Sequence, residues 1–279
     1  MNVGIITSAR SYFQDNFSTP TLGVSLRRLN RNYAGSCIRV RRSSDNTEQD
    51  IGFVNGVLDQ ASLTAFVGAN NGFVTTWYDQ SGNGIDLFNT TAASQPKIVT
   101  SGVILTQSGF PCISTATNLF LRTSGIIFNV PMVNGNSATF ISAIGSHTSA
   151  NTGFYGNRPA AAGTGWIYDW RTASTTYQFT VVGSNSAVLS SPPVSRHIAF
   201  LSKSTSNVLS GWWNNVAGSS NAIGYGGSNI SFYLGVDGTG NASNFYANAN
   251  FYEFIGYPND QTANRVRMQN NLNSYYSIY

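Results

Sequence analysis

The sequence predicts an all-β protein whose strands form a sandwich of two antiparallel sheets. Beyond residue 100, short apolar runs of strand length recur at regular intervals, with turn residues between them. Only 9% of the 279 residues are charged, and Gly, Asn, Ser and Thr take the surface positions instead, which suits strands and turns. The chain is 41% hydrophobic and 13% aromatic, so it can bury a large core as one domain.

The strand-length runs are bounded by clusters of turn-forming residues. The clearest of them cover residues 126–130, 138–144, 165–170, 177–182, 197–201, 208–213, 231–236 and 250–256. The sequence shows no linker, low-complexity tract or repeat between them. We therefore expect an N-terminal arm over residues 1–20 and a single sandwich domain over residues 21–279.

The first 70 residues combine helical and strand patterns. Near-helical spacing of apolar side chains predicts a short helix, ended by Gly35, at Leu22, Leu26, Leu29 and Tyr33. Residues 37–42 alternate apolar and basic side chains, which indicates a half-buried strand with its arginines on one side. Asp59 is a favourable N-cap for a second short helix, which Gly68 would close.

Two more elements are expected further along the chain. Residues 95–99 open another strand. At the C-terminal end, Asn259 and Asp260 would cap a helix. Its spacing predicts that three side chains face the body of the protein, namely Val266, Leu272 and Tyr276.

Residues 77–84 form the most distinctive turn in the sequence. An apolar run stops at Asp79 and becomes a turn in which Gly82 and Gly84 can adopt positive φ at no steric cost. Two interpretations are open. In the first, Asp79, Ser81 and Asn83 form a hydrogen-bonded corner. In the second, the turn brings Asp79 and Asn83 against a ligand.

The charged residues are few and unevenly placed. The net charge is +4, and seven of the fifteen basic residues lie between Arg10 and Arg42. This Arg-rich N-terminal region favours docking to a partner or internal ion pairing over nucleic-acid binding, because basic and aromatic residues are not interleaved there.

Cysteines and histidines give no metal-binding pattern. Cys37 and Cys112 form one disulfide or remain buried thiols, and both alternatives are open. His147 and His197 cannot make a zinc site without carboxylates, so we expect no metal and no cofactor. We also expect no secretion signal and no membrane span.

Aromatic side chains offer candidate platforms for sugar rings. Alternation along a strand would place Trp166, Tyr168 and Trp170 on one face, which is either core or groove. Of the neighbours Trp212 and Trp213, one must point outward if the strand is regular. The candidate carbohydrate-binding residues are Asp79, Asn83, Trp166, Tyr168, Trp213 and Asp237.

Several motifs in their order resemble one known family. The motifs cover residues 38–46, 58–59, 77–84, 234–238, 251–253 and 256–260. They are similar to segments of the catalytic domain of the fungal α-L-arabinofuranosidase B family. Related modules also occur in phage structural proteins. The resemblance implies a concanavalin A-like (LamG-type) jelly-roll sandwich of two antiparallel sheets, with short N-terminal helices and a C-terminal helix.

The resemblance also implies retaining glycosidase chemistry, which needs two carboxylates about 5–5.5 Å apart. Asp237, after the apolar run that ends at Val236, matches the acid of that family. The nucleophile would be a Glu before an Ile-Tyr pair, but residues 162–168 contain no Glu and the only glutamates are Glu48 and Glu253. We therefore expect no second carboxylate at nucleophile distance from Asp237, unless the fold brings Asp169 or Glu253 to it.

Together these observations predict a non-enzymatic virion structural or surface protein, such as a decoration, fibre or spike protein, with a lectin-like fold that can bind host glycans. It would lie on a phage particle or, alternatively, outside a cell. Its partners would be other virion proteins, through the Arg-rich N-terminal region, and a cell-surface glycan, and it would form a homo-oligomer. The alternative is a retaining α-L-arabinofuranosidase-like glycoside hydrolase, with Asp237 as its catalytic acid.

Overall fold

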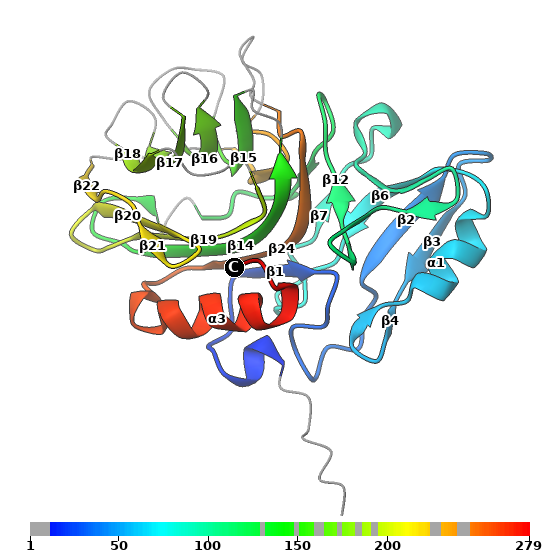
Figure 1. The fold of residues 1–279 in the computed structure, drawn as a ribbon, viewed down its shortest axis with the longest axis horizontal. Coiled ribbons are helices and arrows are strands. Elements are labelled where there is room, and N and C mark those ends of the chain that lie inside the picture. Colours follow the sequence, from blue (N-terminus) through cyan, green and yellow to red (C-terminus); the bar gives the residue numbers. More distant parts are fainter. Residues whose placement is uncertain are drawn as a thin grey trace, which may run out of the picture.

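The structure is a computed structural model, and its elements form one large antiparallel sheet folded into two layers (Figure 1). It describes residues 12–128, 132–147, 151–158, 165–171, 175–181, 186–190, 195–223, 230–238 and 246–279. The two layers confirm the predicted β-sandwich.

The first layer carries strands from the middle of the chain at one end and strands from its first third at the other. Each strand pairs antiparallel with the next. The order is β18 (Ser186–Ser190), β17 (Thr176–Val181), β16 (Trp166–Arg171), β15 (Thr152–Gly156), β23 (Tyr233–Leu234), β13 (Leu121–Arg122), β7 (Leu87–Phe88), β6 (Gly72–Trp77), β2 (Ile38–Arg42) and β3 (Glu48–Ile51).

The second layer is built around two long strands in its centre. Its order is β20 (Val208–Trp213), β19 (His197–Lys203), β14 (Ala138–His147), β24 (Ala249–Tyr257) and β1 (Leu22–Ser25). A bridge of short strands joins the layers, because β12 (Ile113–Ser114) pairs with β24 and with β8 (Lys97–Thr100), and β8 pairs with β6. The sheet is therefore nearly closed on this side.

Short elements complete the fold. Small strands lie at the edges, namely β4 (Phe53–Val54), β5 (Val57–Leu58), β9 (Val103–Ile104), β10 (Thr106–Gln107), β11 (Phe110–Pro111), β21 (Val216–Ala217) and β22 (Asn221–Ala222). The helices are α1 (Gln60–Val67), α3 (Arg265–Tyr276) and the 3-10 turns Phe13–Asp15, Ala92–Ser94 and Thr262–Asn264. No helix in the described ranges is both long and apolar enough to cross a membrane.

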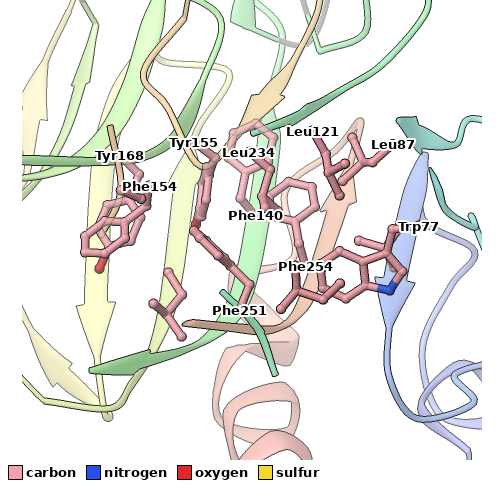
Figure 2. Packing of buried hydrophobic residues seen from close by; sticks show 14 of the residues in the cluster. Trp77, Leu87, Leu121, Phe140, Phe154, Tyr155, Tyr168, Leu234, Phe251 and Phe254 are labelled. Atoms are coloured by element: carbon pink, nitrogen blue, oxygen red, sulfur yellow. The ribbon is translucent and has the colours of Figure 1, made fainter. Parts of the chain in front are cut away.

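A large aromatic core fills the space between the two layers, and Figure 2 shows part of it. Rings from opposite layers stack directly: Phe140 lies 4.3 Å from Trp166, between ring centroids, and Phe232 lies 4.7 Å from Phe254. Such contacts bury 150–250 Å² for each aromatic side chain as an order of magnitude. The high aromatic content of the sequence therefore belongs mainly to this core.

A second core lies between the second layer and α3, below the sheet in Figure 1. Ile141, Phe200 and Ile255 pack there with Met268 and Leu272. Because β14 and β24 are buried on both faces, their sequences do not alternate between apolar and polar residues.

The predicted helix at residues 22–33 is wrong. Residues Leu22–Ser25 form β1, which pairs antiparallel with β24 and has no exposed residue. Leucines at near-helical spacing arise here because Leu22 faces the first core and Leu29 the second. Pairing with a central strand outweighs the weak local helical preference.

The run at 126–130 is also not a strand where the structure describes it. Residues 126–128 lie in a turn, and Phe128 has a φ of 60° with its ring packed against Phe140 and Phe254. Residues 129–130, like residue 182 of another expected strand and residues 1–11 of the expected arm, lie outside the described residues.

The two predicted helices at Asp59 and at the C-terminus are confirmed. Asp59 accepts a hydrogen bond from Ser62 N and Gly68 ends α1. In α3, Leu272 and Tyr276 are buried, but Val266 is 48% exposed, so its predicted inward orientation is wrong. Asp260 Oδ1 accepts a hydrogen bond at 2.8 Å from the N–H of Thr262, the first residue of the 3-10 turn before α3, and the α-helix itself begins only at Arg265.

The cysteines are buried free thiols, which removes the disulfide alternative. Burial raises the pKa of Cys112 to about 12 and that of Cys37 well above its usual value. The segment after residue 12 also contributes to the core, since Phe13 and Phe17 are buried under the second layer.

The turn after β6 is a hydrogen-bonded corner centred on buried Asp79. Its Oδ1 accepts from Gly23 N and Ser81 N, both at 2.9 Å, and its Oδ2 accepts from Ser81 Oγ at 2.6 Å and from Ile85 N at 3.2 Å. The Gly23 bond ties the corner to β1 in the other layer. Asp79 is thus a structural residue that links the layers.

A buried ion pair ties α3 to both β24 and the segment after β1. Arg27 donates to Glu253 in a bidentate manner, Nε to Oε2 at 2.7 Å and Nη2 to Oε1 at 2.9 Å. Ser25 Oγ and Tyr276 Oη donate to the same Oε2, at 2.9 and 3.0 Å. Asn271 of α3 accepts from Arg27 Nη2. Glu253 is therefore fully paired and is not available as a nucleophile.

The corner predicts a conformational cost at Gly84. Gly84 has a φ of +69° and no atom within 4 Å of an added Cβ, so Gly84→Ala should lower the free energy of unfolding by about 1–2 kcal/mol through backbone strain alone. Gly52→Ala is the control, because Gly52 also has open space but no positive φ. Chemical denaturation of both variants measures the difference, and equal stabilities would refute the assignment.

The buried ion pair predicts that a single substitution, Glu253→Gln, strongly lowers the stability of the fold. Glu253→Gln leaves the Arg27 charge buried without its counter-charge and should cost about 3–5 kcal/mol of stability. Asp50→Asn is the control, since it breaks a similar bidentate pair with Arg39 whose side chains are 44% and 39% exposed, and should cost at most about 1 kcal/mol. Similar losses in the two variants by urea denaturation would contradict this prediction.

Candidate functional site

Two carboxylates from different parts of the chain come together at the first layer. Asp169 lies on β16, opposite Gly153 of β15. Asp237 follows β23, which also pairs with β15. Beyond β15, Arg158 N donates to Asp237 O at 3.0 Å. Strand β15 is therefore the common neighbour of the two segments that carry Asp169 and Asp237.

Alternation along β16 decides which way Asp169 points. Trp166, Tyr168 and Trp170 belong to the aromatic core, so Ile167, Asp169 and Arg171 lie on the opposite face of the strand. The Asp169 side chain has no exposed surface, and its Oδ2 forms an ion pair with Arg171 Nε. Within the described residues neither oxygen of Asp169 has a well-aligned hydrogen bond, so the ion pair is electrostatic contact without good hydrogen-bond geometry.

The environment of Asp169 favours its protonated form. Burial raises the pKa of Asp169, and the charge of Asp237 adds to this effect, while Arg171 and Arg158 oppose it; the resulting pKa is about 7. Because Asp237 contributes a Coulombic effect, the two carboxylates are electrostatically coupled. At neutral pH, Asp169 can therefore either hold or release a proton.

Asp237 has its own cationic partner. Arg158 Nη1 donates to Asp237 Oδ2 at 3.0 Å, and the Asp237 side chain is only 3% exposed. The next residue, Gly238, has a φ of +151°, and an added Cβ would lie 1.9 Å from Arg158 O. Only glycine fits this close approach, so the Arg158–Gly238 bridge fixes where Asp237 lies.

The arrangement can carry acid/base chemistry. Two neighbouring carboxylates with different partners are the pattern that separates a proton-holding acid from an ionised carboxylate. The partner arginines are more exposed than the two carboxylates: the side chain of Arg158 is 22% exposed and that of Arg171 is 28% exposed. The expectation that no second carboxylate lies at nucleophile distance from Asp237 stays a prediction, although the charge of Asp237 acts on Asp169.

The predicted sugar platforms lie in the core. Trp166, Tyr168 and Trp213 are at most 2% exposed. Trp213 Nε1 donates to Tyr168 Oη at 2.8 Å, and Tyr168 Oη also bonds His197 Nε2 at 2.7 Å. Their rings present no free face, so the structure supports the core interpretation for all three. Trp212 is the outward neighbour and stacks under Arg265.

The other predicted ligand contacts belong to the corner after β6. Asp79 is buried and saturated by backbone donors, as described above. Asn83 lies at the surface, and its amide donates to Pro20 O at 2.9 Å and to Thr21 O at 3.0 Å. Both residues therefore hold the two layers together in the structure.

Sequence reasoning did not find the two arginines of the site. Arg171 could have been noted, because Asp169 and Arg171 stand two apart on a predicted strand and so share a face. Arg158 carries no such signal, since its contact with Asp237 spans 79 residues. Among the described residues, no group of three His, Cys, Asp or Glu side chains could hold a metal ion.

Comparisons with known proteins point to one class of enzymes. The family model described as "Alpha-L-arabinofuranosidase B, catalytic" matches residues 17–103. A solved arabinofuranosidase complexed with arabinofuranosyl-α-1,2-xylobiose is 18% identical, with a TM-score of 0.67 over 90% of this chain and 62% of that chain. A GH54 α-L-arabinofuranosidase soaked with a cyclic sulfate inhibitor is 17% identical, with a TM-score of 0.62 and the same coverage.

More distant structures share the sandwich. A Trypanosoma rangeli sialidase in complex with sialic acid is 8% identical, with a TM-score of 0.52 over 72% of this chain and 32% of that chain. No curated protein matches the chain. The chain spans 62% of the length of the two arabinofuranosidases, and at these identities the structural likeness establishes the fold alone.

The expectation of a non-enzymatic virion structural protein is contradicted by these comparisons. The family model and the arabinofuranosidase structures support the alternative, an arabinofuranosidase-like glycoside hydrolase domain. The phage relation is not shown by any of them. The chain is thus similar to the α-L-arabinofuranosidase B catalytic family in sequence over residues 17–103, and it has the β-sandwich fold of the solved arabinofuranosidases.

Proposed function

We propose that the chain is an arabinofuranosidase-like glycoside hydrolase whose catalytic carboxylates are Asp169 and Asp237. The observation that carries the proposal is their electrostatic coupling in a buried site, where the pKa of Asp169 is raised to about 7. The similarity to arabinofuranosidases in residues 17–103 and in fold supports α-L-arabinofuranosides as the substrate class.

The surroundings of the two carboxylates assign their roles. Asp169 acts as the general acid, because it holds a proton near neutral pH. Asp237, paired with Arg158, acts as the ionised carboxylate that attacks the anomeric carbon. This order reverses the role of acid that the family resemblance implied for Asp237. The reversal follows from the raised pKa of Asp169, which burial causes.

The reaction then proceeds in two steps. Asp169 donates its proton to the glycosidic oxygen as the carbon–oxygen bond breaks, and Asp237 forms an ester with the anomeric carbon. Water then attacks that carbon, Asp169 accepts a proton from the water, and the Asp237 ester is released as a carboxylate. The configuration at the anomeric carbon is retained. Substrate entry requires Arg158 and Arg171 to move aside, because they lie closer to solvent than the carboxylates.

Hydrolysis of 4-nitrophenyl α-L-arabinofuranoside tests this proposal. Asp237→Asn and Asp169→Asn should each reduce kcat by about 10²–10⁴-fold or more, since each removes one of the two reacting groups. Asp50→Asn is the control, because Asp50 forms an ion pair with Arg39 at the surface. Azide should restore turnover to Asp237→Ala, because it replaces the missing nucleophile, and should leave the rate of the control unchanged. Absence of hydrolysis by the unsubstituted chain, or full activity of Asp169→Asn, would refute the assignment.

The raised pKa of Asp169 also predicts how stability depends on pH. The folded state holds this proton up to about pH 7, whereas the unfolded state releases it near 3.8. The contribution of Asp169 to stability is therefore complete below pH 4 and is lost as the pH rises toward 7, by about 4 kcal/mol at most.

Asp169→Asn removes this titration. Relative to the unsubstituted chain, the variant should become progressively more stable between pH 4 and 7, because all other titrating groups are shared. Urea denaturation across this range measures the difference. A difference that does not change with pH would show that the Asp169 carboxyl titrates normally in the fold.

A further inference from the structure

An open pocket lies beside the hairpin that β4 and β5 form. Its volume is about 470 Å³, which is within the range usual for pockets that hold a small molecule. The residues that line it are Tyr12, Arg28, Phe53, Asn55 and Gly56. In Figure 1 this hairpin lies far from β16, the strand that carries Asp169. The proposed reaction therefore does not use this pocket.

Arg28 is the cation of the pocket, and its charge has no paired counter-charge. All eleven acidic residues of the chain lie in the described ranges, and none of them forms an ion pair with Arg28. Its Nε is buried, and no described residue accepts a hydrogen bond from it. The other described arginines between residues 27 and 42 each donate to a side-chain acceptor, namely Arg27, Arg31, Arg39, Arg41 and Arg42. Arg28 thus differs from its neighbours, whose side chains tie the fold together.

Local structure holds Arg28 in place without using its terminal N–H groups. Its backbone N donates to Gly56 O at 2.8 Å, in a two-residue hairpin turn where Asn55 and Gly56 both have positive φ. Its guanidinium carbon lies 5.3 Å from the centroid of the Phe53 ring. Stacking on a ring orients the guanidinium plane and leaves the N–H groups at its edge free to donate. Within the part of the chain that the structure describes, Nη1 and Nη2 are neither buried nor hydrogen-bonded, so they can contact a ligand.

The charges around the pocket favour a ligand with a single negative charge. Arg31 stacks 5.7 Å from the centroid of the Tyr12 ring, but Asp15 already pairs with it at 2.9 Å. The surplus charge is therefore that of Arg28 alone. A carboxylate matches this charge and can accept two parallel N–H bonds from one guanidinium. A phosphate dianion would bring a second negative charge for which these residues offer no partner.

The remaining lining suits a ring that carries hydroxyl groups. Tyr12 contributes a phenol O–H, which both donates and accepts, and Phe53 contributes apolar surface. A pocket of this volume holds one such ring with its substituents. A sugar acid combines a carboxylate, hydroxyl groups and apolar C–H edges in one ring, so it matches both the cation and the other walls.

We infer that this pocket binds a uronate residue of a glycan. The uronate carboxylate accepts from Nη1 and Nη2 of Arg28, and a ring hydroxyl contacts Tyr12 Oη. The choice of a sugar acid rests on the proposed function, because a glycoside hydrolase acts on glycans, whereas the assignment of a carboxylate site rests on Arg28 alone. The pocket is a binding site without catalytic groups.

NMR titration of the full chain with D-glucuronate tests this inference. D-glucose is the matched neutral probe, and acetate is the carboxylate without a ring. Glucuronate should bind saturably, with a Kd on the order of millimolar for so small a contact, and more tightly than glucose or acetate. Because none of the three probes contains an arabinofuranosyl group, the titration reports binding alone, and a failure of the hydrolase proposal would leave its result unchanged.

Arg28→Gln should weaken glucuronate binding by roughly tenfold, which is about 1.4 kcal/mol. Arg39→Gln is the control, because it removes the same charge from an exposed arginine that does not line the pocket, and it should leave the affinity unchanged. Arg28→Lys keeps the charge but loses the bidentate contact, so its affinity should lie between those of Arg28→Gln and the unsubstituted chain. This variant keeps the test valid if Arg28→Gln is unstable.

Four outcomes would overturn the inference. No saturable binding of glucuronate would remove the site, and equal affinities for acetate and glucuronate would leave an adventitious anion only. Equal losses in Arg28→Gln and Arg39→Gln would show a general charge effect. Tighter binding of inorganic phosphate or of N-acetylglutamate amide would assign the pocket to a phosphate group or to an acidic peptide.

Discussion

The pairing of Arg27 with Glu253 is the constraint on which the second layer depends. Glu253 lies in β24, between β1 and β14, and its carboxylate is fully buried. A buried carboxylate is tolerated only when it is paired and hydrogen-bonded. Here the partners come from the segment after β1 and from α3, so the central strand can be buried only when both have docked. The ion pair therefore couples the docking of three segments that are far apart in the sequence.

The aromatic core, in turn, places the candidate site. Trp166 stacks on Phe140 and Tyr168 stacks on Phe154, so β16 has a fixed rotation about its own axis. A strand whose even-numbered side chains are held in the core must present its odd-numbered side chains on the other face. The core residues on either side of Asp169 along β16 therefore fix the face on which its side chain lies. The precision of the site thus comes from packing on the opposite face of the strand.

Much of the fold could be predicted from the sequence, but the candidate site could not. The strands, the helix capped by Asp59 and the corner at Asp79 follow from local patterns such as alternation and turn chemistry. The helix expected around Leu26 failed because leucines of a short strand and of the following segment enter two different cores. The electrostatic effect of Asp237 on Asp169 and the ion pair of Arg27 with Glu253 depend on which strands become neighbours, and no local pattern specifies that. The burial of Trp166 and Trp213 could not be predicted either, since an aromatic residue on a strand has the same sequence pattern whether it packs in the core or lines an exposed binding surface.

Other aspartates of the chain show what distinguishes Asp169 from a structural ion pair. Asp45 and Asp50 also have arginine partners, and hydrogen bonds from Arg42 and Arg39 lower their pKa values. Asp169 has Arg171 beside it, yet its pKa is raised, because burial outweighs the nearby cation and a second carboxylate lies close by. A buried carboxyl group whose surroundings disfavour its ionised form does not stabilise the fold at neutral pH, so selection for stability alone would not retain it. Groups with this kind of conflict concentrate at sites where proton transfer takes place. The comparison within one chain therefore separates Asp169 from the ion pairs that hold the fold together, and it favours a chemical role for the pair that it forms with Asp237.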